Sequence, residues 1–339
     1  MTEQIAARRP GLSVQLQRLF VRIGVLPFLL VIALIVFSAL SPRFLTSENL
    51  ITVARQATYL AIVSMGQMLA LLTGGFDLSV GKIIAITSVI TAMTMAPLAA
   101  AHPDAIALTL TLGIIAGVGA GTLVGVVNGI GVAVFNVSPF MMTLGTATIS
   151  FGIALTLTSG VPVYGMPDAF GTIFSFARIF DIPSPVYVTA GLFVVMYFLL
   201  NWTRMGRYFY AVGGNIKAAR LSGISTRYYL FMAYVLCGLL AAIAGALLTA
   251  RLETGEANIG ASMPLDSIAA CVIGGVSLRG GIGRVGNVVL GAVFIGLIQN
   301  GMDLAQIQSY LQEVAIGVLL ILAVIADQLR QFVMLRLKD

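Results

Sequence analysis

Apolar runs separated by short polar segments follow one another along the whole chain. The runs cover residues 23–40, 51–72, 83–100, 105–134, 140–158, 186–200, 228–250, 265–277, 285–301 and 314–325. Several of them contain the ~20 consecutive apolar residues that a helix needs to cross the ~30 Å hydrocarbon core of a bilayer. The pattern therefore predicts an all-α, polytopic membrane protein with about ten transmembrane helices.

The composition supports this prediction. Of the 339 residues, 59% are hydrophobic and only 9% are charged, and the mean hydropathy is +1.02. Ordinary globular domains carry roughly 25% charged residues, so the chain lacks the polar surface of a soluble protein. The net charge of +6 does not indicate a nucleic-acid partner, because the basic residues lie at the ends of the apolar runs, where they orient a protein in membrane lipid.

These basic residues set the predicted topology. They precede the first run, occur throughout the polar segment 203–227 and follow the last run: Arg8, Arg9, Arg18, Arg22, Arg204, Arg207, Lys217, Arg220, Arg227, Arg330, Arg336 and Lys338. The positive-inside rule places them in the cytoplasm. We therefore expect a cytoplasmic N-terminal segment at 1–22, a transmembrane domain at 23–327 with segment 203–227 on its cytoplasmic side, and a cytoplasmic tail at 328–339. The first run is too long for a cleaved signal peptide. By the same count, the polar stretches 159–185 and 251–263 lie outside.

One long run carries glycines at every fourth position. They are Gly113, Gly117, Gly121, Gly125 and Gly129. This spacing makes a flat stripe on a helix, which another helix backbone can approach closely. The stripe predicts tight packing; a sliding surface in a moving bundle is the functional alternative.

Few ionisable residues lie in or near the runs, and they are Asp77, Lys82, Asp266 and Glu313. Capping of a following helix accounts for Asp77 and Asp266, while Lys82 can extend to the membrane surface. No relay of buried carboxylates is evident, which argues against an ion-coupled carrier. The candidate residues of a transport path are Gln67, Asp77, Asn128, Thr143, Asn287 and Asn300. They suit a hydroxyl-rich neutral solute, and equally well bonds between neighbouring helices.

Two pairs of segments resemble each other and raise the possibility of an internal repeat. GGFDLSVG at 74–81 is similar to GGVSLRGG at 274–281, and GVVNG at 125–129 is similar to GLIQNG at 296–301. Glycine-interrupted segments in corresponding halves are typical of transporters built from repeats, although chance similarity is comparably common in so glycine-rich a chain.

The sequence contains no segment that matches a nucleotide-binding or catalytic motif in both spacing and context. Segment 75–82 has the wrong glycine spacing for a P-loop, and the G-x-G-x-x-G at 281–286 follows no predicted strand. The single histidine, His102, offers no metal site, and Cys237 and Cys271 lie in apolar runs as small hydrophobes. We therefore predict a non-catalytic protein that binds no cofactor, with any ATP and Mg²⁺ used by a partner.

Segment 217–223 has the spacing of the E-A-A-x-x-x-G signature of ABC importer permeases, with Lys217 in place of the glutamate. Further matching phrases are GGFDLSVG at 74–81, SPFMMTLGTATI at 138–149, AVGGNIKAARLSGI at 211–224 and LDSIAACVIGGVSLRGGIG at 265–283. The resemblance extends in order from about residue 25 to about residue 330. The chain resembles the ribose/galactoside/xylose/arabinose-type ABC transporter permeases.

This resemblance implies a permease subunit that works by alternating access in the bacterial cytoplasmic membrane. It implies a cytoplasmic ATPase subunit, an external sugar-binding protein and a second permease copy or paralogue. Contact with the ATPase would involve Gly213, Gly214, Asn215, Lys217, Ala218, Ala219 and Gly223. The solute would be a monosaccharide or a polyol. An autoinducer-2-type importer of the same family, an ion-coupled secondary sugar carrier and a non-transporting membrane scaffold are the alternatives.

Overall fold

The computed structural model describes residues 26–336 of the chain. Its elements, in order, are α2 (Leu26–Leu40), α3 (Ser47–Leu72), α4 (Val80–Ala101), α5 (Ile106–Ala133), α6 (Pro139–Thr158), α7 (Asp168–Gly171), the π-helical turn η1 (Thr172–Phe176), β1 (Arg178–Ile179), β2 (Ile182–Pro183), α8 (Ser184–Trp202), α9 (Arg204–Gly214), α10 (Ile216–Leu221), α11 (Thr226–Leu252), α12 (Met263–Ile273), α13 (Val285–Leu304) and α14 (Ser309–Arg336). The predicted N-terminal segment 1–22 with its arginines, and Lys338 in the predicted tail, lie outside the described residues.

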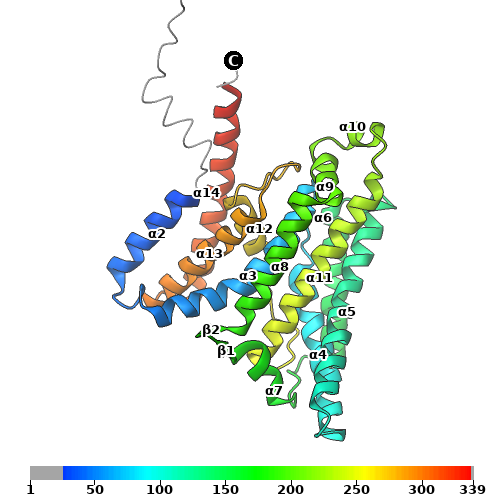
Figure 1. The fold of residues 1–339 in the computed structure, drawn as a ribbon, viewed down its shortest axis with the longest axis vertical. Helices are drawn as coiled ribbons and strands as arrows, with labels where there is room; N and C mark the ends of the chain where they lie inside the picture. Colours follow the sequence, from blue (N-terminus) through cyan, green and yellow to red (C-terminus); the bar gives the residue numbers. More distant parts are fainter. Residues whose placement is uncertain (1–25, 337–339) are drawn as a thin grey trace, which may run out of the picture.

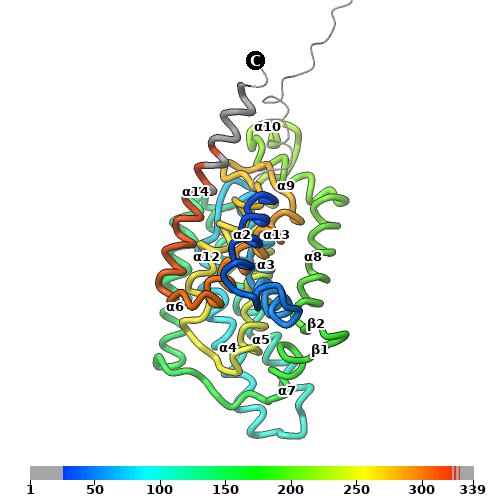
Figure 2. Tube along the Cα trace, turned by 90° about the vertical axis from the view of Figure 1, so that its left-hand side faces the viewer, coloured from blue at the N-terminus to red at the C-terminus, as the bar shows by residue number. Residues whose placement is uncertain are grey.

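Each predicted apolar run contains a helix in the described part of the chain, although the run at 265–277 is helical only to Ile273. The prediction of an all-α polytopic membrane protein is confirmed. Among the described residues, α4, α5, α6, α8, α11 and α13 are long and apolar enough to cross a membrane. The helices form a bundle, with α9 and α10 at one end and α7 and the β1–β2 hairpin at the other (Figure 1). In the perpendicular view, α14 and α8 lie along opposite sides of the bundle (Figure 2).

Helix α3 is the centre of this bundle. All its residues from Ala57 to Leu72 are buried, and it contacts α8, α9, α11, α12 and α13. A helix buried on every side needs no lipid-facing surface. This position explains how α3 accommodates the polar residues Ser64 and Gln67, both of which are fully buried.

The glycine stripe of α5 lies between α4 and α11. A Cβ atom on Gly117 would overlap the side chain of Thr91 on α4, and one on Gly125 would lie 2.7 Å from the Tyr234 carbonyl oxygen and 3.0 Å from the Gly238 Cα of α11. Backbone of one helix therefore packs directly on backbone of another, as the tight-packing interpretation predicts. The sliding-surface alternative stays untested.

The segment between α11 and α12 differs from the prediction. Residues 251–263 were expected to form a polar stretch outside the membrane. Instead, Gly255 packs against Ser88 and Ala92 of α4, and Gly260 packs against Ile84, nearer the start of the same helix. Helix α12, at 11 residues, is about 16 Å long and does not cross the hydrocarbon core by itself. The non-helical segment 253–262 therefore enters the bundle beside α4, and α12 continues from it.

Adding a methyl group to the glycine stripe tests the packing directly. We expect Gly125→Ala to destabilise the protein by about 1–3 kcal/mol, because the backbone atoms that it would meet cannot move aside. The measurement is the thermal unfolding temperature of the purified protein in detergent. Gly119→Ala, on the same helix, is the matched control, because a Cβ there meets no atom within 4 Å. Equal unfolding temperatures for the two variants would contradict the packing account.

Candidate functional site

The predicted cytoplasmic segment 203–227 forms two short helices, α9 and α10, at one end of the bundle (Figure 1). Helix α9 buries Gly206, Phe209 and Val212 against the bundle and exposes Arg204 and Arg207. Its amphipathic pattern thus holds it on the protein surface.

Asn215 forms the corner between α9 and α10. Its backbone N–H donates to the Ala211 carbonyl at the end of α9 (3.1 Å), and its side-chain oxygen accepts from the Ala218 N–H of α10 (3.0 Å). One residue therefore ends the first helix and caps the second. At the other end of α10, Gly223 has φ +79°, and the Ile224 N–H donates to the Ala219 carbonyl (3.0 Å). Gly223 therefore ends α10 in a left-handed conformation, as glycine commonly does at the C-terminus of a helix.

The outward surface of α10 differs from the predicted contact set. Ala219 is only 5% exposed, so it faces the body of the protein, whereas Lys217, Ala218 and Arg220 are exposed. Leu221 is 90% exposed. Sequence reasoning missed this leucine, because it is one of several apolar residues in segment 203–227 and nothing in the sequence marks it as exposed.

A backbone junction joins α9 to the centre of the bundle. Gly213 packs so closely on the C-terminus of α3 that a Cβ on it would overlap the Leu72 carbonyl oxygen and lie 2.7 Å from the Gly281 nitrogen. That same Leu72 carbonyl accepts a hydrogen bond from the Gly281 N–H (2.9 Å). Gly280 lies in the loop between α12 and α13, and a Cβ on it would be 2.9 Å from the Gly213 carbonyl oxygen. We call the contact of Leu72, Gly213, Gly280 and Gly281 the glycine junction.

Tyr210 adds a side-chain bond to the glycine junction. Its hydroxyl donates to the Gly283 carbonyl (3.0 Å). Burial raises the pKa of the Tyr210 phenol above its usual value, against the opposing effect of nearby Arg284. The phenol therefore keeps the proton that it donates to the loop.

The structure brings four of the six predicted path residues together in a buried polar cluster. Asp77 Oδ1 accepts from the Ser79 N–H (2.8 Å) and hydroxyl (2.5 Å), and Asn128 donates to Ser79 Oγ (2.8 Å) and to Asp77 Oδ2 (3.4 Å). Thr146 donates to the Asn128 side-chain oxygen (2.6 Å).

Thr143 and Gln67 complete this cluster. The Thr143 hydroxyl accepts from the Leu78 N–H (3.2 Å), and the Gln67 amide pairs with the backbone N–H and carbonyl of Asp77 (3.0 Å each). Asp77, Gln67, Asn128 and Thr143 have no exposed surface in this chain. Satisfied polar groups of this kind fix the loop between α3 and α4 against α5 and α6.

The other two predicted path residues lie elsewhere. Asn300 on α13 forms a reciprocal amide pair with Asn49 at the start of α3 (2.8 and 2.9 Å). Asn287 is exposed near the start of α13. Five of the six predicted path residues are therefore buried in two separate groups and Asn287 is exposed, and their role in a transport path stays a prediction.

The first of the two internal resemblances has a structural counterpart, shifted by one residue. At the end of α3, Gly74 has φ +85° and its N–H donates to the Leu71 carbonyl; at the end of α12, Gly275 has φ +82° and donates to the Val272 carbonyl. The second resemblance does not belong to the same repeat. Asn128 lies on the second helix after the first motif, whereas Asn300 lies on the first helix after the second motif.

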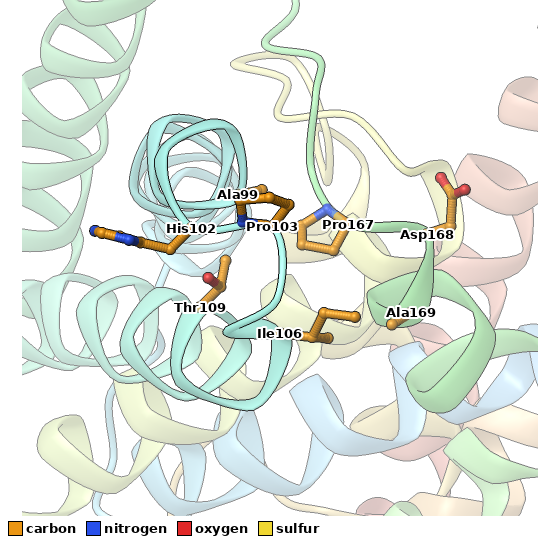
Figure 3. Close-up of a pocket in the computed structure, with 8 residues that line it drawn as sticks. All are labelled: Ala99, His102, Pro103, Ile106, Thr109, Pro167, Asp168 and Ala169. Carbon is orange, nitrogen blue, oxygen red and sulfur yellow. The ribbon is translucent and has the colours of Figure 1, made fainter.

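A cavity of about 320 Å³ lies at the end of the bundle opposite α10, between the α4–α5 turn and α7. Pro103, Ile106 and Pro167 contribute to its walls, and the side chains of His102 and Asp168 are directed to opposite sides (Figure 3). Among the described residues, no three His, Cys, Asp or Glu side chains are grouped so as to hold a metal ion.

Comparison with known proteins decides the family. Residues 49–324 match the family described as branched-chain amino acid transport system / permease component. The chain belongs to this family. It is a multi-pass membrane permease, a transport component rather than a catalyst. No solved structure matches the chain.

Three curated relatives of the permease illustrate the similarity. It is 36% identical to the ribose import permease protein of Escherichia coli (strain K12) over 89% of this chain and 92% of that protein. It is 37% identical to the D-allose transport system permease protein of the same strain, over 89% and 90% of the two chains. It is 38% identical to the ribose import permease protein of Bacillus subtilis (strain 168), over 89% and 92%.

Neighbouring glycines in the permease provide a test of the glycine junction. We expect Gly213→Ala to loosen α9 from the bundle, because the added methyl group overlaps the Leu72 carbonyl, whereas a Cβ on Gly214 meets no atom within 4 Å. Brief trypsin digestion of the purified protein should therefore cleave segment 203–227 faster in Gly213→Ala than in Gly214→Ala. Indistinguishable digestion of the two variants would show that the junction does not hold α9.

Proposed function

We propose that this permease is the membrane subunit of an ATP-driven, binding-protein-dependent importer of a monosaccharide or a related polyol. The observation that carries the proposal is the similarity, over nearly nine-tenths of the chain, to permeases named for ribose and for D-allose. An L-arabinose transport system permease protein of Escherichia coli (strain K12) is also 34% identical over 86% of the chain. All three named solutes are neutral and rich in hydroxyl groups.

The proposed contact with the ATPase subunit is the outward surface of α10. Leu221 supplies an apolar side chain that is almost completely exposed, and Lys217 and Arg220 are exposed beside it on the same short helix. An apolar anchor that inserts into a pocket dominates the binding energy of most interfaces, while charged residues at the rim set orientation and salt dependence. The surface therefore suits a cleft with an apolar floor and acidic edges.

The glycine junction supports a route by which the ATPase would act on the transport path. A displacement of α10 passes through Asn215 to α9, and from Gly213 to the C-terminus of α3 and the α12–α13 loop. ATP and Mg²⁺ would be bound by the ATPase, with no cofactor on this chain. Closure of the ATPase pair would open the path toward an external sugar-binding protein, and hydrolysis would reset it.

The proposed setting is the bacterial cytoplasmic membrane, with both termini in the cytoplasm and a second permease copy or paralogue completing the path. The basic segment 203–227 supports this orientation, because the positive-inside rule places it on the cytoplasmic side. The cavity beside α7 then lies on the outer side, where the binding protein would dock. Autoinducer-2-type import is the alternative solute within this proposal, and an ion-coupled carrier is not favoured by the named relatives.

Reconstitution tests the proposal. The permease is placed in liposomes with its ATPase subunit and binding protein, and uptake of labelled ribose, allose and arabinose is measured with and without ATP. We expect uptake of at least one of these sugars only when ATP and all components are present. Uptake by the permease alone, driven by an ion gradient, would contradict the proposal.

Leu221→Ala tests the docking surface. We expect it to weaken binding of the ATPase subunit at least about tenfold, since loss of an anchor side chain commonly costs more than about 1.4 kcal/mol. The matched control is Phe180→Ala, because Phe180 is 92% exposed but lies in the β1–β2 turn at the opposite end of the bundle. The measurement is a titration of detergent-solubilised permease with the ATPase. Equal affinity for the two variants would rule out the assigned role of Leu221.

A further inference from the structure

The non-helical segment 253–262 lies at the depth of the membrane-spanning helices. Its contacts on α4 move from Ser88 and Ala92, at Gly255, to Ile84 and Gly81, at Gly260. This shift of seven to eight helical positions corresponds to about 11 Å along α4. The same stretch of α4 contacts Gly117 and Gly121, near the middle of the 28-residue α5.

Burial alternates along this segment. Gly255, Ala257 and Ile259 are buried, and Ala257 packs in a small apolar cluster with Val89 of α4 and Ala154 of α6. The intervening residues are polar: Thr254 and Glu256 are half-buried, and Asn258 is exposed, as is Ser262. We call Thr254, Glu256, Asn258 and Ser262 the polar edge.

Local bonds hold the polar edge in place. The Glu256 backbone N–H donates to Ser88 Oγ of α4 (3.2 Å), and the Thr254 hydroxyl donates to the Glu256 carboxylate (3.3 Å). Gly255 also pairs with Val163 through two backbone hydrogen bonds of 2.9 Å. The inner side is therefore fixed to α4 and to the segment after α6, and the exposed Asn258 and the partly exposed Glu256 lie on the other side.

The hydrocarbon of the membrane cannot be the environment of the polar edge. Irregular backbone occurs at membrane depth only where protein buries it or where it lines a water-filled cavity. A carboxylate or an amide facing lipid would lose its hydrogen bonds to water, and a carboxylate at the bilayer centre costs at least about 2.5–3.5 kcal/mol. The outward side of this segment carries both a carboxylate, on Glu256, and an amide, on Asn258.

We propose that the polar edge lines the transport path and that Glu256 and Asn258 contact the hydroxyl groups of the sugar as it passes. This inference rests on the proposed function for the nature of the solute. A carboxylate accepts hydrogen bonds from two hydroxyls, and an amide both donates and accepts, so the pair suits neighbouring hydroxyl groups of a neutral sugar. Polar groups on one edge of the path would bind the sugar only weakly. Weak binding is what a transport path needs, because it must release its solute.

Lys82 and Phe151 lie near the buried side of segment 253–262. The Lys82 Nζ lies 3.7 Å from the centre of the Phe151 ring, and Phe151 packs against the cluster that contains Ala257. An aromatic ring and a cation thus lie close to the segment that presents Glu256 and Asn258. The buried Asp77 cluster is different, because its side chains are fully enclosed and bond to one another.

Thiol labelling in membranes tests the water exposure of the polar edge. Asn258→Cys and Leu123→Cys are compared, because Leu123 is 61% exposed on the apolar side of α5, near the same depth. The native Cys237 and Cys271 are buried and give little background. A charged, membrane-impermeant methanethiosulfonate should modify Asn258→Cys at least about tenfold faster than Leu123→Cys. An apolar environment raises the pKa of a thiol, and each pKa unit lowers the concentration of the reactive thiolate tenfold.

Uptake measurements test the sugar contact separately. Glu256→Gln and Asn258→Ala should each lower uptake severalfold, with unchanged amounts of permease in the membrane and unchanged ATPase binding. Labelling of Asn258→Cys no faster than that of Leu123→Cys would overturn the path assignment. Fast labelling with wild-type uptake in both Glu256→Gln and Asn258→Ala would overturn the sugar contact. Fast labelling of a permease that transports no sugar would contradict the proposed function and support the path assignment, because labelling needs no transport.

Discussion

The contact between Gly213 and the Leu72 carbonyl constrains the whole molecule, because it joins α9 to the buried end of α3 with no side chain between them. Leu72 ends a stretch of α3 that is buried on every side and that packs against the helices of both halves of the bundle. The same carbonyl accepts from Gly281 in the α12–α13 loop. A close-packed interior does not deform continuously, so force applied at α10 has to move these segments together.

The bilayer imposes a second constraint, because polar groups at membrane depth need hydrogen-bond partners. The polar residues of this chain meet it in two ways. Asp77 and its neighbours bond to one another and lose all contact with solvent. Glu256 and Asn258 keep outward-facing polar groups on irregular backbone beside α4. The first arrangement fixes a scaffold, and the second needs water. Since α12 continues directly from the segment that carries Glu256, the polar edge and the glycine junction lie at the two ends of one short helix and its flanking loops.

The fold was largely predictable from the sequence, because length and hydropathy decide which segments form transmembrane helices. The α5 stripe was also recognisable, since glycine at every fourth position indicates a helix face that neighbouring helices approach closely. Three features were not predictable. Ala219 faces inward because of how α10 is oriented on the bundle. The Leu72–Gly213 contact joins residues that are far apart in the sequence. From the sequence alone, segment 253–262 is predicted to be an outer loop, because its burial depends on contacts with α4. In each case the deciding contact is tertiary.

We expect α9 and the α12–α13 loop to move as one body during transport, because they are in backbone contact at the glycine junction. The most direct measurement joins Gly214→Cys to Ile282→Cys with a short, reducible bifunctional thiol reagent, since Gly214 and Gly281 are in contact and both substituted positions are exposed. ATP-driven uptake is then compared before and after linking. The account predicts unchanged uptake in the linked protein. Uptake that is abolished by the link and restored by its reduction would contradict it.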